Sequence, residues 1–176
     1  VVAKGVEDTA FYRYHRLVAL NEVGGDPRSF GVSLKAFHAA SEDRAKSWPR
    51  TMLGTSTHDT KRSEDARSRI GVLSELASGW RLTLRRWSLL NRSGRREIEG
   101  AAAPSASDEY LYYQSLLAIW PSAAPGENER GQWKKMSAAD MLKAVREAKE
   151  RTSWINPDEH YEAALEHFIA QSFDNE

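Results

Sequence analysis

The residues best suited to chemistry lie close together in the run from Thr55 to Asp65. This run contains a histidine, a carboxylate and a lysine at His58, Asp59 and Lys61. A carboxylate accepts hydrogen bonds, a lysine donates them, and a histidine can do either. It is the densest group of such side chains in the sequence, and it is therefore the first candidate for an active site.

A strand is predicted immediately before this run. Thr51–Thr55 is rich in β-branched and apolar residues and follows the helix stop Trp48-Pro49. His58 and Asp59 would then lie at the carboxyl end of a strand. Open sheets and (β/α)8 barrels build their active sites at that end of their strands.

A helix is predicted immediately after the run. Thr60 is the expected N-cap, and Glu64 and Asp65 suit the positive first turn. Apolar residues then recur at helical spacing at Ala66, Ile70, Leu73 and Ala77. The alternative interpretation of Asp59 is that it only caps this helix. Arg62, with the two acidic residues of the first turn, is expected to orient the loop rather than to bind a ligand.

Several segments carry a family resemblance. The run Thr57–Asp65 resembles the maltooligosyltrehalose synthase form of a motif of the α-amylase clan, glycoside hydrolase family 13, in which a His-Asp pair follows the seventh barrel strand. Residues 3–14, which include Lys-Gly-Val-Glu-Asp, and residues 21–27 resemble the same family, as do residues 103–105 and 114–121. The likeness covers most of the first 121 residues.

The resemblance implies a reaction and catalytic roles for Asp59 and His58. Family members convert the reducing-end α-1,4 bond of a maltooligosaccharide into an α,α-1,1 bond by intramolecular transglucosylation. Retaining glycosyl transfer uses a nucleophile and an acid/base about 5 Å apart. Asp59, preceded by His58, matches the clan's third carboxylate, which hydrogen-bonds the sugar in subsite −1. No motif for the clan's nucleophilic Asp or acid/base Glu occurs in this sequence.

The resemblance also implies substrate-binding roles for Lys4, Glu7 and Lys61, which would hold the released glucose in subsite +1 while it turns over. From spacing alone, Lys4 and Glu7 would be a solvated ion pair at a helix terminus. The expected ligand is a maltooligosaccharide, with no cofactor and no metal ion. A maltooligosyltrehalose trehalohydrolase is the functional partner that the resemblance implies.

Composition limits the other possibilities. The 176 residues include 25 basic and 25 acidic side chains, so no global charge indicates nucleic acid or an anionic membrane. Cysteine is absent, which excludes disulfides and thiolate metal sites. No apolar run reaches the roughly 20 residues of a membrane span. We expect a soluble, cytoplasmic protein, and because a (β/α)8 barrel needs about 250 residues, a C-terminal portion of an enzyme.

The remaining pattern predicts a mainly α fold with one or two short strands. Residues 1–99 would be the late part of a catalytic barrel, and residues 100–176 a helical C-terminal region. Helices are predicted over 6–20, over 33–48 with Ser33 as its cap, around Trp80–Leu90, and from Ser107, Ser137 and Asn156 onward. Residues 100–106, which are small and contain a proline, are predicted to be a linker.

Two other functions are possible on the sequence alone. One is an α-amylase-type hydrolase, against which Lys4, Glu7 and Lys61 argue. The other is a helical module that binds nucleic acid through the arginines of the segment 81–96 with their interleaved tryptophans. A solvated helix face is the simpler interpretation of those arginines.

Overall fold

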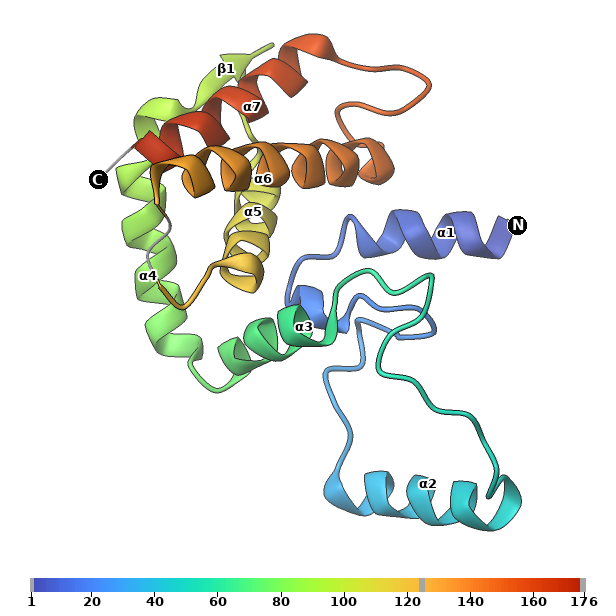
Figure 1. Ribbon diagram of the computed structural model, residues 1–176. Helices are drawn as coiled ribbons and strands as arrows, with labels where there is room; N and C mark the ends of the chain where they lie inside the picture. The colour runs from blue at the N-terminus through green and yellow to red at the C-terminus, as the bar shows by residue number, and fades with distance from the viewer. Residues whose placement is uncertain (1, 124–125, 175–176) are drawn as a thin grey trace.

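The computed structural model describes residues 2–123 and 126–174, with side chains from residue 5 onward, and this part of the chain is mainly helical (Figure 1). The helices are α1 (Val2–Phe11), α2 (Leu34–Ser47), α3 (Glu64–Gly71), α4 (Ala77–Leu90), α5 (Ala106–Ile119), α6 (Glu127–Ala148) and α7 (Glu159–Asp174). The 3-10 turns are η1 (Val18–Leu20), η2 (Val72–Ser74) and η3 (Arg92–Gly94). Two short strands, β1 (Arg96–Ile98) and β2 (Ala101–Ala103), pair antiparallel. The predicted fold class is confirmed.

The core lies among α5, α6 and α7, with α7 and α6 running side by side (Figure 1). Helix α5 is apolar almost all round, as the sequence predicts, and its Leu111 and Tyr112 are almost fully buried. Helix α7 contributes the predicted stripe, Tyr161, Leu165, Phe168 and Ile169, each buried. These helices form a hydrophobic platform for the N-terminal elements.

The N-terminal elements are attached to this platform by α3 and by a buried glutamine. Helix α3 packs on α5 through Ala66 and Ile70. On α5, the side chain of Gln114 accepts a hydrogen bond from Val18 N at 2.9 Å and donates one to His15 O at 2.8 Å. Because Gln114 is fully buried, these bonds fix the backbone between α1 and η1.

The first helix is shorter than predicted, ending at Phe11 rather than near Leu20. The buried side chain of Asn21 explains the difference, since its Nδ2 donates to Phe11 O at 2.7 Å and Tyr14 O at 2.6 Å. Those carbonyls are satisfied by a residue up to ten positions away, so the chain can leave the helix without an unpaired buried group.

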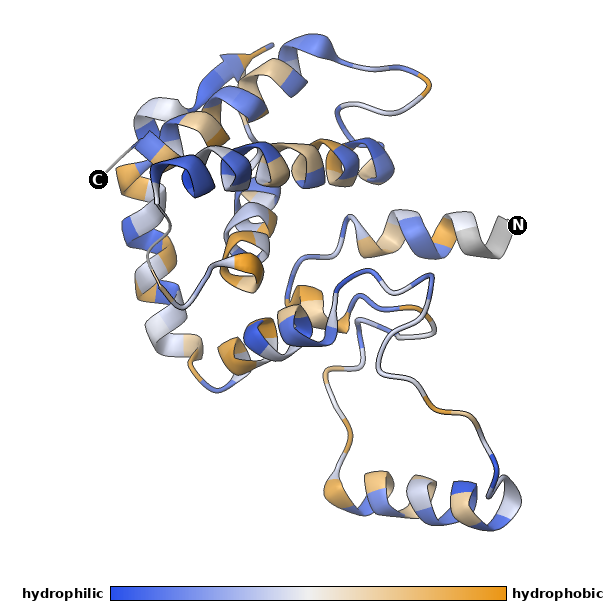
Figure 2. Cartoon of the chain, viewed as in Figure 1, coloured by the Kyte–Doolittle hydropathy of each residue, from blue (hydrophilic) through white to orange (hydrophobic). Residues whose placement is uncertain are grey.

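Helix α2 stands apart from the rest of the described chain and mixes hydrophobic with hydrophilic residues (Figures 1 and 2). Ser33 caps it as predicted, its side chain accepting from Ala36 N. The chain then returns without regular structure over residues 51–54, so the predicted strand Thr51–Thr55 is wrong for this structure. A strand needs a hydrogen-bonding neighbour, and Met52 here is 96% exposed.

Three further predicted boundaries are corrected. Residues 100–106 are not a linker, because Ala101–Ala103 forms β2 and Ser105 already caps α5. Helix α6 begins near Gly126, where Glu129 accepts from Gly126 N, and so Ser137 lies within the helix. The cap of α7 is Asp158 rather than Asn156, since its Oδ1 accepts from Tyr161 N at 2.9 Å. Sequence patterns that resemble helix caps also occur at positions where no helix begins.

A partly buried ion pair ties α6 to α7. Arg146 donates two hydrogen bonds to Glu162, at 2.8 and 2.6 Å, and the buried hydroxyl of Thr152 donates a third at 2.6 Å. The hydrogen bonds from Arg146 lower the pKa of Glu162 below its ordinary value of 4.5. The carboxylate therefore stabilises the fold above about pH 4.5, and this contribution is lost as the pH falls through the lowered value.

We expect Glu162→Gln to lower the free energy of unfolding at pH 7 by about 1.5–3 kcal/mol, because hydrogen bonds to a charged group are lost. The difference from wild type should shrink as the pH falls below 4. Urea denaturation at both pH values measures it. Glu159→Gln, at an exposed position of the same helix, is the control. A difference between wild type and Glu162→Gln that does not depend on pH would contradict the role of the charge.

Candidate functional site

His58 and Asp59 form a tight turn closed by two threonines. Thr60 N donates to Thr57 O at 3.2 Å, and Thr57 N donates to the Thr60 hydroxyl at 2.7 Å. Asp59 N donates to the Thr57 hydroxyl at 3.3 Å. Within the turn, His58 is exposed and Asp59 is half-buried. Thr60 thus closes the turn and is not the predicted helix cap.

The cap of α3 is Ser63, whose side chain accepts from Ala66 N at 3.3 Å. Glu64 and Asp65 occupy the first turn of the helix as predicted. Asp59 lies four residues before the cap, so the interpretation of Asp59 as the cap of this helix is wrong. Its carboxylate is left to a role outside helix capping.

Lys61 turns back toward α1. Its Nζ donates to Asp8 Oδ1 at 2.6 Å, and both side chains are largely buried. Burial lowers the pKa of Lys61, but the hydrogen bond and charge of Asp8, with smaller contributions from Tyr12 and Asp59, raise it overall. The ammonium is therefore a fixed cation whose electrostatic field reaches Asp59.

Glu7 lies in α1 directly before Asp8 and is half-buried. Its Oε1 accepts from Gly24 N at 2.9 Å, which ties the loop after η1 to α1. Gly24 has a φ of +75°, a conformation that favours glycine. The backbone of Lys4 belongs to α1, but its side chain lies outside the described residues.

Glu22 joins the same loop to the turn. Its carboxylate accepts from Lys61 N at 2.9 and 3.1 Å and from Arg62 N at 3.5 Å. Three segments distant in sequence therefore meet here: α1 through Glu7 and Asp8, residues 22–24, and the turn 57–62. The structure brings Glu7 and Lys61 into one polar cluster next to Asp59.

The chain is similar to known proteins over most of its length. The chain is 42% identical over 163 residues to a maltooligosyl trehalose synthase of Mycobacterium tuberculosis. It resembles the solved structures of the Sulfolobus tokodaii enzyme (34% identity, TM-score 0.82) and of the Arthrobacter ramosus enzyme (40% identity, TM-score 0.78). These alignments cover 92%, 99% and 96% of this chain. The relatives that match most of this chain are maltooligosyltrehalose synthases.

The match is to one part of those larger synthases. The chain spans 20% of the length of the Mycobacterium tuberculosis relative, and 22% and 20% of the two solved structures. No protein-family model matches the chain. The similarity therefore covers one segment of those synthases, and the polar cluster lies within that segment.

Sequence reasoning missed two residues of the polar cluster. Asp8 and Glu22 both lie within segments that carry the family resemblance, but neither spacing nor motif assigned them a role. Their partner Lys61 is 53 and 39 residues away, respectively. Their positions in the sequence could have indicated a role, because Asp8 directly follows Glu7 and Glu22 directly follows Asn21 in segments that resemble the family.

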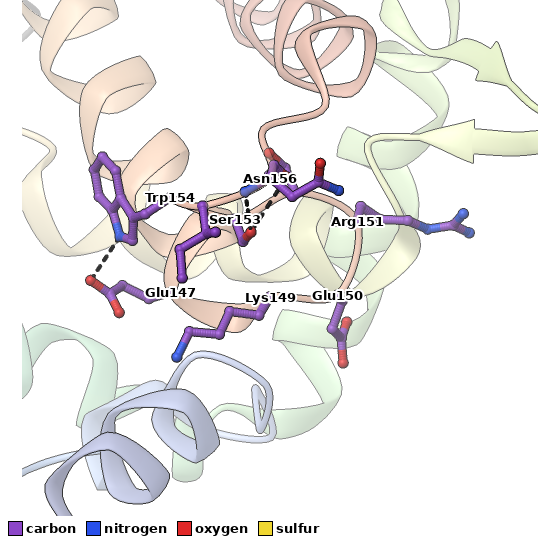
Figure 3. A pocket seen from close by; sticks show the side chains of 9 residues that line it. Glu147, Lys149, Glu150, Arg151, Ser153, Trp154 and Asn156 are labelled. Atoms are coloured by element: carbon purple, nitrogen blue, oxygen red, sulfur yellow. Dashed lines mark hydrogen bonds between the residues drawn. The ribbon is translucent and has the colours of Figure 1, made fainter. Parts of the chain in front are cut away.

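One cavity lies apart from this cluster. It has a volume of about 440 Å3 and is bordered by residues 147–156 between α6 and α7, where Trp154 Nε1 donates to Glu147 at 3.0 Å (Figure 3). None of the predicted site residues lines it. A smaller cavity of about 260 Å3 lies against the turn instead, with Lys61, Arg62 and Asp140 on its wall.

The described residues include no group of three or more His, Asp or Glu side chains that could hold a metal ion. No helix among them is long and apolar enough to cross a membrane. Of the arginines predicted as a possible nucleic-acid face, Arg95 is instead hydrogen-bonded to the buried Glu109 and to Ser88. This internal contact removes one arginine from that face.

Proposed function

We propose that this chain carries part of the active site of an enzyme that converts the reducing-end α-1,4 bond of a maltooligosaccharide into an α,α-1,1 bond. The observation that supports the proposal is the polar cluster itself. Glu7, Asp8, Glu22 and Lys61 meet beside Asp59 in a segment that matches maltooligosyltrehalose synthases over most of its length. We place the enzyme in the α-amylase clan, glycoside hydrolase family 13.

Asp59 would act at subsite −1. An ionised carboxylate there accepts hydrogen bonds from sugar hydroxyls and stabilises the positive charge of an oxocarbenium-like transition state. His58, exposed beside it, would contact the same sugar. The nucleophile and the acid/base would come from other parts of a full-length synthase, since this sequence contains neither motif.

Lys61, Glu7 and Lys4 would act at subsite +1, where the released glucose must turn over and attack the glycosyl-enzyme. Holding one small sugar against competition from water requires several polar contacts, because proximity greatly favours the bound acceptor. Lys61 is already fixed by Asp8, and Glu7 by Gly24. Such fixed groups hold an acceptor without further ordering.

Product analysis of a full-length synthase carrying this segment tests the proposal. With maltopentaose, we expect reducing ends to disappear with little free glucose. A gain of reducing ends would instead indicate an α-amylase-type hydrolase. Salt-sensitive binding to single-stranded nucleic acid, without any conversion of maltopentaose, would support the Arg-rich binding module.

The isolated 176-residue chain should show no turnover of maltopentaose above the buffer background. One stabilising carboxylate without a nucleophile and an acid/base lacks the covalent route. Chromatography of the purified chain with maltopentaose measures this. Turnover by the chain alone would show that it contains a complete catalytic set and would contradict the assignment of Asp59.

The product would be a chain ending in trehalose, and its use requires a hydrolase that cuts next to the new bond. We therefore propose that the enzyme works in the cytoplasm in sequence with a maltooligosyltrehalose trehalohydrolase. Free trehalose should form from maltopentaose only when both enzymes are present.

A further inference from the structure

Glu22 is held rigidly by its neighbours. It follows Asn21, which is 99% buried and hydrogen-bonded to two carbonyls of the preceding segment. Gly25 N donates to Glu22 O at 2.8 Å and closes a turn after it. A Cβ at Gly25 would lie 2.9 Å from Glu22 O and 3.0 Å from Leu20 O, so this turn is too tight for another residue. The backbone that carries the Glu22 carboxylate thus has little freedom.

The Glu22 carboxylate accepts hydrogen bonds from the C-terminal end of the turn 57–62, which carries Asp59. Oε1 accepts from Lys61 N at 2.9 Å, and Oε2 accepts from the same amide at 3.1 Å and from Arg62 N at 3.5 Å. These amides follow Asp59 by two and three residues. Oε1 also accepts from Val23 N at 3.0 Å, which orients the carboxylate. One side chain therefore connects the turn to a fixed part of the fold 39 residues away.

The N-terminal end of the turn is held by a different contact. Residues 51–54 form no secondary structure, and Leu53 is 75% exposed. Arg67 of α3 donates to Thr55 O, two residues before the turn begins at Thr57. Within the turn, further hydrogen bonds join Thr57, Asp59 and Thr60. The side chain of Glu22 thus holds the C-terminal end of the turn from a distant part of the sequence.

We propose that Glu22 is a positioning residue that sets the location of Asp59 through the amides of Lys61 and Arg62. The inference rests on the proposed function, because it assigns Glu22 to the same transglucosylation site. A shift of the Lys61 amide would move Asp59, because one residue, Thr60, separates the two in sequence. A displacement of about 1 Å at a reacting group can lower a rate on the order of a hundredfold.

The test uses Glu22→Ala and Glu22→Gln in a full-length synthase. Glu22→Ala removes the anchor, and we expect kcat to fall about 10- to 100-fold with KM changed less than about threefold. Glu22→Gln keeps an oxygen that can accept from Lys61 N, and should restore kcat to within about fivefold of wild type. Asp26→Ala is the matched control, because its carboxylate accepts hydrogen bonds from Arg28 in the same loop.

The double variant Glu22→Ala/Asp59→Asn separates positioning from general support of the fold. If Glu22 acts through Asp59, removing it from an enzyme that already lacks the Asp59 carboxylate should lower kcat no further. An additional loss equal to that of Glu22→Ala alone would overturn the inference, as would an unchanged kcat in Glu22→Ala.

The same series distinguishes this inference from the proposed function. Wild-type kcat in Asp59→Asn would defeat the proposed function and with it the role of Glu22. A large loss in Asp59→Asn together with full activity in Glu22→Ala would leave the proposed function intact and refute the positioning role alone.

Discussion

Asp59→Asn in a full-length synthase should lower kcat by several orders of magnitude with a much smaller effect on KM. The substitution keeps the shape of the side chain but removes its charge. Because an oxocarbenium-like transition state is more positive than the bound substrate, the lost interaction is one made mainly in the transition state. The half-buried position of Asp59 reduces the compensation that water can provide.

The measurement is the initial rate of loss of reducing ends from maltopentaose over a range of substrate concentrations. Asp65→Asn is the matched control, an exposed carboxylate in the first turn of α3 whose contribution to the helix is small. Thermal unfolding of both variants should stay close to wild type, since Ser63 and not Asp59 caps the helix. An Asp59→Asn enzyme as active as wild type would leave Asp59 with no catalytic role.

The helical half of the molecule was predictable from local pattern. In α5 and α7 the apolar residues recur at a helical period and bury the expected faces, with Tyr112 and Phe168 in contact at 5.9 Å between ring centroids. Ser33 caps α2 as its sequence indicates. In these elements the signal and its physical cause lie within one or two turns of each other.

The corrected elements depend on contacts between distant residues. The end of α1 is decided by Asn21, and the path of residues 15–18 by Gln114, which is 96 positions from Val18. The predicted strand Thr51–Thr55 has suitable residues but no neighbouring strand in the described chain. The local sequence pattern shows which secondary structure a segment favours, but the segment's contact partners decide whether that structure forms.

The candidate site likewise combines residues that motifs indicated with residues that only the structure reveals. Asp59, Lys61 and Glu7 were named from motifs, and the structure places Lys61 and Glu7 in one cluster beside the turn that carries Asp59. Asp8 and Glu22 were missed because their partners lie far along the chain. Sequence resemblance marks the residues that would meet the substrate, whereas the residues that hold them become visible only in three dimensions.

Lys61→Ala or Glu7→Ala should change the products rather than only the rate. If these side chains hold the cleaved glucose in subsite +1, their removal leaves Asp59 in place but lets glucose leave and water enter. Free glucose released per α,α-1,1 bond formed should then rise. Loss of one charge-assisted hydrogen bond, worth about 1.5–3 kcal/mol, would raise that ratio by roughly one to two orders of magnitude.

Chromatographic product analysis on maltopentaose at matched conversion measures the ratio. Lys35→Ala, which removes an exposed lysine from α2, is the control for loss of a positive charge. Asp8→Asn keeps the ammonium of Lys61 but weakens its anchor at 2.6 Å, and should give an intermediate ratio. If both Lys61→Ala and Glu7→Ala release glucose in the wild-type proportion, neither side chain holds the acceptor. Lys61 would then serve only its ion pair with Asp8, and Glu7 only its bond to Gly24.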